Sequence, residues 1–193
     1  MRMPAIYLDN AASTRVSEPV LALLTEVMRT AWGNPSAQHP QGAAARAHIA
    51  TGRARLLAAL GDNPDRPAGD IVWTSGCTEA DALAILGAAR LRKGPVVASS
   101  IEHPAVTNAV ADLGDAHGVT FVAPDSSGVL DPEAVAEAAA GAAVVAIVMV
   151  QNELGIVQPI AAIAQAVRRR APDCHLHVDG AQAFGKIALD VSA

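Results

Sequence analysis

The sequence predicts an α/β fold in which a mostly parallel sheet carries helices on both faces. From residue 70 onward, short apolar runs alternate with longer segments of helical periodicity, a pattern typical of βαβ units. Hydrophobic residues make up 51% of the 193-residue chain and charged residues 17%. These proportions indicate a globular protein with a buried core and exclude a disordered chain.

The first part of the chain is expected to hold an extended arm and two helices. Ser17 is a candidate N-cap, and Pro19 suits the first turn of a helix that the segment 33–35 ends. A second helix is expected at about 42–60, and the polar, Pro-rich segment 61–69 is expected to be a surface loop.

The remainder predicts strands connected by helices. Strands are expected at 71–74, 96–99, 119–123, 143–150 and 175–178. Helices are expected at 79–91, from 102 to about 117, from 131 onward and at 160–170. Because strands joined through helices run in the same direction, we expect a mostly parallel sheet.

Charge and cysteine content narrow the functional classes. The net charge of -5 gives no basis for nucleic-acid binding, and the basic run 168–170 suits the dipole at the end of its helix. The two cysteines, Cys77 and Cys174, do not form a disulfide framework. Without an apolar run of about 18 residues or a basic-then-apolar leader, we expect a cytoplasmic protein that binds no membrane.

The stretch 175–182 is the strongest functional signal, because it places an acidic residue where a strand ends. Open α/β sheets bind ligands at the carboxyl ends of their strands. Asp179 can pair with a pyridinium nitrogen and thereby keep the ring an electron sink, and Gln182 can donate a hydrogen bond to a ring oxygen. We therefore expect a heteroaromatic cofactor here.

Three further turns carry polar residues at the same predicted sheet edge. The turn 75–79 precedes a helix, whose N-terminal N–H groups can bind an anion, although an ordinary capped helix start explains it equally. His103 can stack on a flat ring or simply cap a helix. The polar residues 151–153 follow a very apolar strand and indicate either a site or a turn.

A metal site is the alternative interpretation of the final stretch. His175, His177 and Asp179 share one face of the predicted strand, and their spacing suits metal ligands. Sites of that type usually recruit another histidine nearby, and none follows. We therefore assign no metal.

Six segments, in this order, resemble the pyridoxal-phosphate-dependent cysteine desulfurases of the class V aminotransferase family. They are Tyr7-Leu-Asp-Asn-Ala-Ala-Ser-Thr14, Gly33-Asn-Pro-Ser36 with His39 and Gly42, Thr74-Ser-Gly-Cys-Thr-Glu-Ala-Asp81, Glu102-His-Pro104, Val150-Gln-Asn-Glu-Leu-Gly155, and His177-Val-Asp-Gly-Ala-Gln182 with Gly185-Lys186. Together they span nearly the whole chain.

The resemblance implies roles for individual residues. Thr78 and the turn around Cys77 would hold the cofactor phosphate, and His103 would stack on the ring and transfer protons. Asn152 and Gln182 would bond near the ring hydroxyl, and Asp179 would pair with the ring nitrogen. The residues expected to border the substrate pocket are Asn10, Ala11, Ala12 and Asn34.

The resemblance also implies what the chain lacks. The family's Ser-x-His-Lys stretch with the Schiff-base lysine is absent, as are its catalytic-cysteine loop, its substrate-carboxylate arginine and its small domain. Lys93 and Lys186 occupy other positions, and neither cysteine is expected to be the catalytic thiol. Ala82 stands where the family often has Asn. Residues 1–16 would be an arm, and 17–193 an incomplete large domain of a fold type I transferase.

We therefore expect the N-terminal part of a cysteine desulfurase, inactive alone. Family members convert L-cysteine to L-alanine and pass persulfide sulfur to acceptor proteins, as in iron–sulfur cluster assembly. The expected partners are a second copy in a homodimer or a complementing C-terminal half. The alternatives are one subunit of a split desulfurase, another class V lyase such as selenocysteine lyase, and a non-catalytic partner-binding fragment. Intact cofactor contacts speak against the last.

Overall fold

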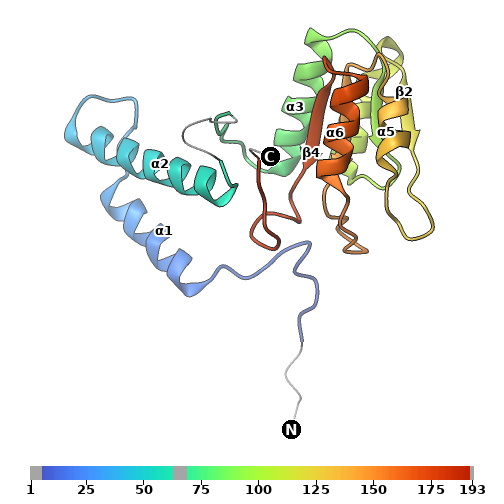
Figure 1. Cartoon of the computed structure of the whole chain (residues 1–193). Helices are drawn as coiled ribbons and strands as arrows, with labels where there is room; N and C mark the ends of the chain where they lie inside the picture. Colours follow the sequence, from blue (N-terminus) through green and yellow to red (C-terminus); the bar gives the residue numbers. More distant parts are fainter. Residues whose placement is uncertain (1–5, 63–68, 192–193) are drawn as a thin grey trace. The chain divides into compact units, whose positions relative to one another are not determined.

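The computed structural model describes residues 6–62 and 69–191 (Figure 1). They divide into two compact units, one built from the described residues up to Ile71 together with 189–191, the other from Val72–Ala188. Most of the loop predicted at 61–69 lies outside the described residues. The division into an arm of 1–16 and a domain of 17–193 stays a prediction.

The first unit contains the two expected helices, α1 (Glu18–Thr30) and α2 (Pro40–Ala59). Ser17 occupies the N-cap of α1, although its side chain makes no capping hydrogen bond. At α2 the cap is His39, whose Nδ1 accepts a hydrogen bond from the Gly42 N–H at 3.2 Å. This cap explains why α2 begins two residues earlier than predicted.

The second unit is built on a four-stranded parallel sheet. Its strands are β1 (Val96–Ser99), β2 (Val119–Val122), β3 (Val144–Val148) and β4 (His175–Asp179), in the order β2-β1-β3-β4. The chain moves from β1 outward to β2 and then returns to the other side of β1 to form β3. A topological switch point therefore lies between β1 and β3, and ligands bind at such points in open α/β sheets.

Helices cover both faces of this sheet, as predicted (Figure 1). One face packs against α3 (Cys77–Leu91) and α4 (Pro104–Ala111), and the other against α5 (Pro132–Ala138) and α6 (Ile160–Arg170). The alternation of strand side chains divides the core between the faces: Val96, Ala98, Val144 and Ala146 pack toward α3 and α4, whereas Val97, Val145 and Ile147 pack toward α5 and α6. Among the described helices, none has the length and apolarity that a membrane crossing requires.

The prediction of a strand at 71–74 is wrong. The structure assigns no strand there, and Val72 and Trp73 are 76% and 52% exposed. Its local pattern is that of a strand, but a strand also needs hydrogen-bonded neighbours. In the described chain the sheet consists of β1 to β4 only. The local alternation of residues 71–74 was therefore not sufficient to form a fifth strand.

Two other predicted elements are shorter than expected. The helix predicted from 102 to about 117 ends at Ala111 and is followed by a separate 3₁₀ turn, η1 (Gly114–Ala116). Gly114 adopts a φ of 53°, a left-handed conformation that prevents α4 from continuing through this residue as an α-helix. The strand predicted at 143–150 ends at Val148, and Val150 instead forms an antiparallel bridge with Val157.

Candidate functional site

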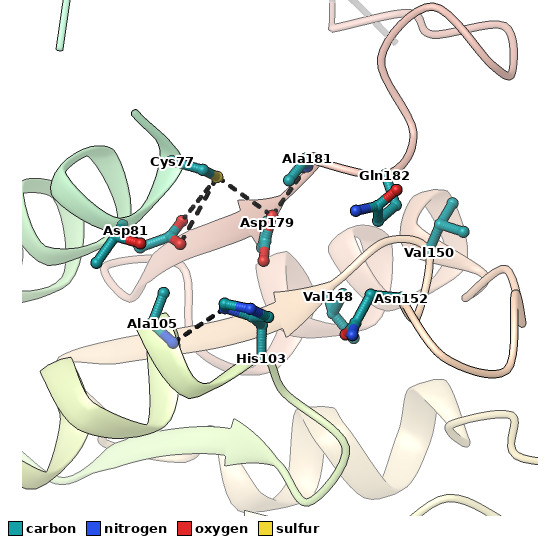
Figure 2. A pocket seen from close by; sticks show the side chains of 11 residues that line it. Cys77, Asp81, His103, Ala105, Val148, Val150, Asn152, Asp179, Ala181 and Gln182 are labelled. Carbon is teal, nitrogen blue, oxygen red and sulfur yellow. Dashed lines mark hydrogen bonds between the residues drawn. The ribbon is translucent and has the colours of Figure 1, made fainter. Parts of the chain in front are cut away.

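A pocket of about 160 Å³ lies at the carboxyl edge of the sheet, where β3 and β4 end (Figure 2). It is lined by Cys77, Thr78, Asp81, His103, Ala105, Val148, Val150, Asn152, Asp179, Ala181 and Gln182. An interior cavity of about 150 Å³ accommodates benzene in another protein. The pocket is therefore large enough for one aromatic ring. It also brings together all six residues predicted to bind the cofactor.

The N-terminal part of α3 forms one wall of the pocket. Gly76 is the N-cap, and a Cβ added there would meet nothing within 4 Å, so the space before the helix is open. Ser75 donates from its N–H and its Oγ to Glu79 Oε2, at 2.7 and 2.6 Å, and these bonds lower the pKa of Glu79. The Ser75 hydroxyl is thus engaged with Glu79. Thr78, in the first turn of α3, carries a hydroxyl group and lines the pocket.

His103 both caps α4 and lines the pocket, so its role as a cap does not exclude a role toward a bound ring. Its Nδ1 accepts a hydrogen bond from the Ala105 N–H at 3.1 Å. A neutral imidazole that accepts at Nδ1 carries its proton on Nε2. In Figure 2 the ring lies across the pocket from Asp179, a position from which it can cover one face of a bound ring.

Asp179 ends β4 and is only 4% exposed. Its Oδ1 accepts hydrogen bonds from the Ala181 N–H at 2.9 Å and from the Cys77 thiol at 3.6 Å. Burying a carboxylate is costly unless hydrogen bonds or a cation compensate it. The backbone N–H supplies part of this compensation, and the arrangement suits a protonated ring nitrogen as the remaining partner.

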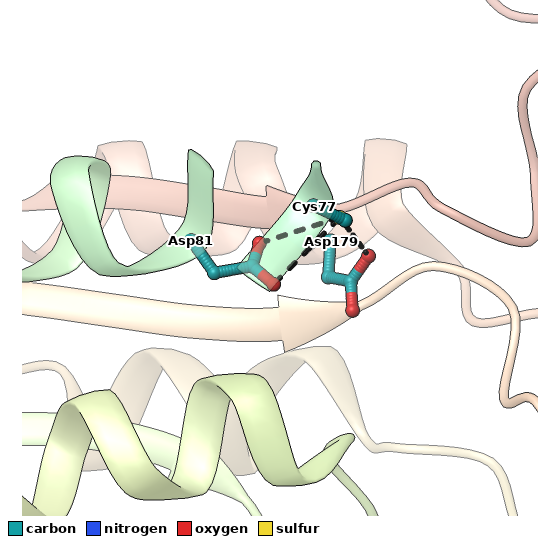
Figure 3. Close-up of side chains that lie close together, drawn as sticks. All are labelled: Cys77, Asp81 and Asp179. Carbon is teal, nitrogen blue, oxygen red and sulfur yellow. Dashed lines mark hydrogen bonds between the residues drawn. The ribbon is translucent and has the colours of Figure 1, made fainter. Parts of the chain in front are cut away.

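Cys77 lies between two buried carboxylates, Asp81 and Asp179 (Figure 3). Burial first, and then the charges of Asp179 and Asp81, raise the pKa of Cys77 to about 12. The thiol is therefore protonated at neutral pH and donates to the carboxylates. A protonated thiol is a poor nucleophile, consistent with the prediction that Cys77 is not the catalytic cysteine.

The residues that could hold a metal differ from the predicted set. Ligand atoms of Cys77, Asp81 and Asp179 all lie within 4.8 Å of one another, so of the predicted set only Asp179 belongs to this group. His177 instead places its Nε2 3.0 Å from Asp81 Oδ1. Side chains of these types often lie close together without a metal, so their proximity is not sufficient evidence for one. The group therefore carries no metal assignment.

Two amide side chains complete the pocket. Asn152 follows β3 in the turn after Val150, and Gln182 follows β4. The Nζ of Lys186 donates a hydrogen bond to Gln182 Oε1, one helical turn away in sequence. Both amides thus lie at the pocket after strand ends, and their contact with a ring hydroxyl stays a prediction.

The predicted substrate-pocket residues belong to the first unit. Asn10 Oδ1 accepts a hydrogen bond from Thr14 Oγ1 at 2.9 Å, and Asn34 Oδ1 accepts one from the Ser36 N–H at 2.9 Å. Ala11 and Ala12 lie in the same segment as Asn10. Their role at the pocket border stays a prediction.

Sequence reasoning missed two polar residues at this edge. Asp81 is only 2% exposed and lines the pocket one turn after Cys77 on α3. The spacing of four residues between them is a helical signal that could have indicated a shared face. Glu102 is the second such residue. The sequence indicates it only as part of the segment Glu102-His-Pro104, whereas its carboxyl group contacts the ends of β1 and β3.

The comparisons with known proteins agree on one family. The family described as Aminotransferase class-V matches residues 6–193. Over 202 residues the chain is 37% identical to the cysteine desulfurase IscS of Salmonella arizonae, with 100% of this chain and 48% of the relative covered. It is 36% identical to a cysteine desulfurase of Nostoc sp., with 98% and 47% covered.

Solved structures show the same relationship. A NifS-like protein superimposes with a TM-score of 0.87 at 29% identity, covering 96% of this chain and 51% of the other. The protein SspA, solved in complex with cysteine, gives a TM-score of 0.85 at 36% identity, covering 96% and 53%. The chain therefore spans about half the length of the relatives it matches.

Proposed function

Because the chain belongs to the class V aminotransferase family, we propose that its pocket binds pyridoxal phosphate and that it is the N-terminal part of a cysteine desulfurase. Relatives named cysteine desulfurase match across essentially the whole chain, and SspA was solved with cysteine. L-cysteine is therefore the proposed substrate of the whole protein, and a persulfide-accepting protein is its proposed partner.

The observation that carries the proposal is the position of Asp179. It is a buried carboxylate at a strand end, and it faces His103 across a pocket of ring size. When bound, pyridoxal phosphate supplies an electron sink for carbanion chemistry at the substrate's α-carbon. Asp179 holds a proton on the ring nitrogen, because its negative charge favours the cationic ring over the neutral one.

The other pocket residues orient the ring. Thr78 and the free N–H groups at the start of α3 hold the phosphate, since a helix N-terminus attracts anions. His103 covers one face of the ring and can exchange a proton through Nε2. Asn152 and Gln182 donate hydrogen bonds near the ring hydroxyl. The geometry offers a donor or acceptor on each side of the pocket and keeps one ring face for His103.

We also propose that the 193 residues do not desulfurate cysteine by themselves. The sequence contains two lysines, Lys93 and Lys186. Neither lines the pocket, and Lys186 makes its hydrogen bond to Gln182. The amine that captures the cofactor aldehyde would come from a part of the protein outside these residues, as would the sulfur-accepting thiol.

Equilibrium dialysis of pyridoxal phosphate against the purified chain tests the binding proposal. Asp179→Asn removes the charge but keeps the shape, and it should weaken binding by roughly 10- to 100-fold, the value of a hydrogen bond to a charged group. Asp173→Asn makes the same charge change at an exposed residue and should leave binding unchanged. Equal affinity of the Asp179 variant and the parent chain would refute the assignment.

A second experiment tests the need for a further lysine. After incubation with pyridoxal phosphate and borohydride reduction, the intact mass of the chain should show no stoichiometric adduct. A single adduct mapped to Lys186, or alanine released from cysteine by the pure chain, would show that the chain provides its own amine and would refute the proposal.

A further inference from the structure

Glu102 lies at the switch point of the sheet but does not line the pocket. It comes three residues after the end of β1 and immediately before His103. Its Oε1 accepts hydrogen bonds from the Ser99 hydroxyl and, at 2.8 Å, from the Val148 N–H. One carboxyl oxygen thus contacts the ends of both β1 and β3.

The bond to Val148 replaces a missing ladder contact. The register between β1 and β3 ends at the pair Ala98 and Ala146, two residues before Val148. On its other side, β3 continues to pair with β4 as far as Asp179. A carboxyl oxygen of Glu102 therefore takes the place of the strand carbonyl that β1 no longer offers, and it holds the two strands together where they would otherwise separate.

This contact determines where the next residue lies. Glu102 is tied to β3, and His103 is tied to the start of α4 through its Nδ1 and the Ala105 N–H. Two successive residues are thus fixed to two different elements. The backbone between them has little freedom to move, so the imidazole is held at a defined position over the pocket.

The second oxygen of the Glu102 carboxyl group has no partner. Among the described residues, Oε2 is the buried side-chain oxygen or nitrogen that no hydrogen bond reaches. Asp179 on β4 adds a negative charge nearby, while His177 on β4 favours the charged form of Glu102, as do Ser99 on β1 and the N–H of Val148 on β3. Burial outweighs the favourable contacts and raises the pKa of Glu102 to about 7. Protonation of the carboxyl group removes the buried charge, and a pKa of about 7 means that both protonation states are populated near neutral pH.

We propose that Glu102 is a positioning residue for His103: its carboxyl group joins the ends of β1 and β3 and fixes the imidazole over the pocket. The inference rests on the proposed function only in giving His103 a role toward the bound ring. The hydrogen bonds by which Glu102 joins β1 and β3 are present in the chain without any ligand.

NMR of the ligand-free chain tests whether Glu102 joins the ends of β1 and β3. The Cδ signal of Glu102 should titrate with a midpoint near pH 7, well above that of the same residue in the chain unfolded in urea. The amide proton of Val148 should shift with the same midpoint, because its acceptor gains a charge. The His103 Nδ1 signal and the Ala105 amide should contain a component with this midpoint as well.

Variants separate positioning from general destabilisation. Glu102→Gln keeps an oxygen acceptor and cannot ionise, so the shared midpoint should vanish while the Ala105 amide stays protected. Glu102→Ala should make that amide exchange roughly tenfold faster or more, as expected of a local opening. Glu26→Gln, the same change on exposed α1, should alter none of these signals.

Two results would overturn the inference. One is a Val148 amide that does not respond to the ionisation of Glu102 in the parent chain. The other is a His103 Nδ1 signal and an Ala105 amide that remain unchanged in Glu102→Ala. Because no readout requires pyridoxal phosphate, failure of cofactor binding in the dialysis experiment would leave this test intact.

Discussion

Replacing Glu102 by Gln should make the stability of the second unit less sensitive to pH. The pKa of Glu102 rises from 4.5 to about 7 in the folded chain, mainly because the carboxyl group is buried. An acid with a raised folded pKa stabilises the fold fully below its unfolded pKa, and this contribution is lost as pH rises through the folded value. The parent chain should therefore lose stability between about pH 4 and pH 8.

The size of the loss follows from the two pKa values. Each tenfold change in relative protonation corresponds to about 1.4 kcal/mol. A rise from 4.5 to about 7 therefore corresponds to a loss of about 3 kcal/mol across this pH range. The Gln variant cannot ionise and does not share this loss, so its stability relative to the parent should improve by about the same amount.

Urea unfolding followed by far-UV circular dichroism at four pH values measures this difference. Titrating groups that do not interact with Glu102 contribute equally to both chains, so they cancel when the free energy of unfolding of the parent is subtracted from that of the variant. The difference therefore reports the titration of Glu102 together with its coupling to Asp179 and His177. Glu26→Gln provides the reference for a charge change at an exposed helical site. A difference between parent and Glu102→Gln that is constant with pH would refute the assignment of a buried, protonated carboxyl group.

Two further predictions concern the thiol beside the pocket and the core beneath it. With a pKa near 12 instead of 9.0, Cys77 has about a thousandfold less thiolate near pH 8. Alkylation of Cys77, followed by mass spectrometry, should therefore be slower in the folded chain than in the urea-unfolded chain by about that factor. Equal alkylation rates in the two states would contradict this prediction. Ile147→Ala removes a fully buried side chain and should cost about 2 to 5 kcal/mol in urea unfolding, whereas Leu154→Ala, at a residue 67% exposed, should cost less than about 0.5 kcal/mol.

The strands and helices that sequence reasoning placed correctly are those with strong local signals. The helix predicted at 160–170 has the bounds of α6, and the strand predicted at 175–178 differs from β4 by one residue. Asp131 caps α5, accepting from the Glu133 N–H at 3.1 Å, as its residue type indicates. In each case the determinant is periodicity or a cap within a few residues.

The predictions that were wrong concern elements that no local signal determines. Whether 71–74 forms a strand depends on which chain segments lie beside it, and no local pattern specifies a neighbour. The end of α4 depends on Gly114 adopting a left-handed conformation, which a glycine permits without requiring. These outcomes are decided by tertiary context.

The same distinction applies within the site. The six residues predicted to bind the cofactor all line one pocket, and each could be singled out because it follows or precedes a recognisable element in a motif. The bond from the Val148 N–H to Glu102 joins residues 46 positions apart, and that between His177 and Asp81 joins residues 96 positions apart. Neither pairing can be read from spacing, because it depends on the order of strands in the sheet.

The parallel direction of the strands also explains how this pocket is assembled. Parallel strands deliver their carboxyl ends to one edge, so His103 after β1, Asn152 after β3 and Asp179 at the end of β4 meet there although they lie far apart in sequence. An antiparallel arrangement would have sent alternate strand ends to opposite edges. The order β2-β1-β3-β4 further places β2 at the edge away from β4, which explains why none of the pocket-lining residues lies in the segment between β2 and α5. A buried acid that joins β1 to β3 therefore lies between His103, which follows β1, and the lining residues at the ends of β3 and β4.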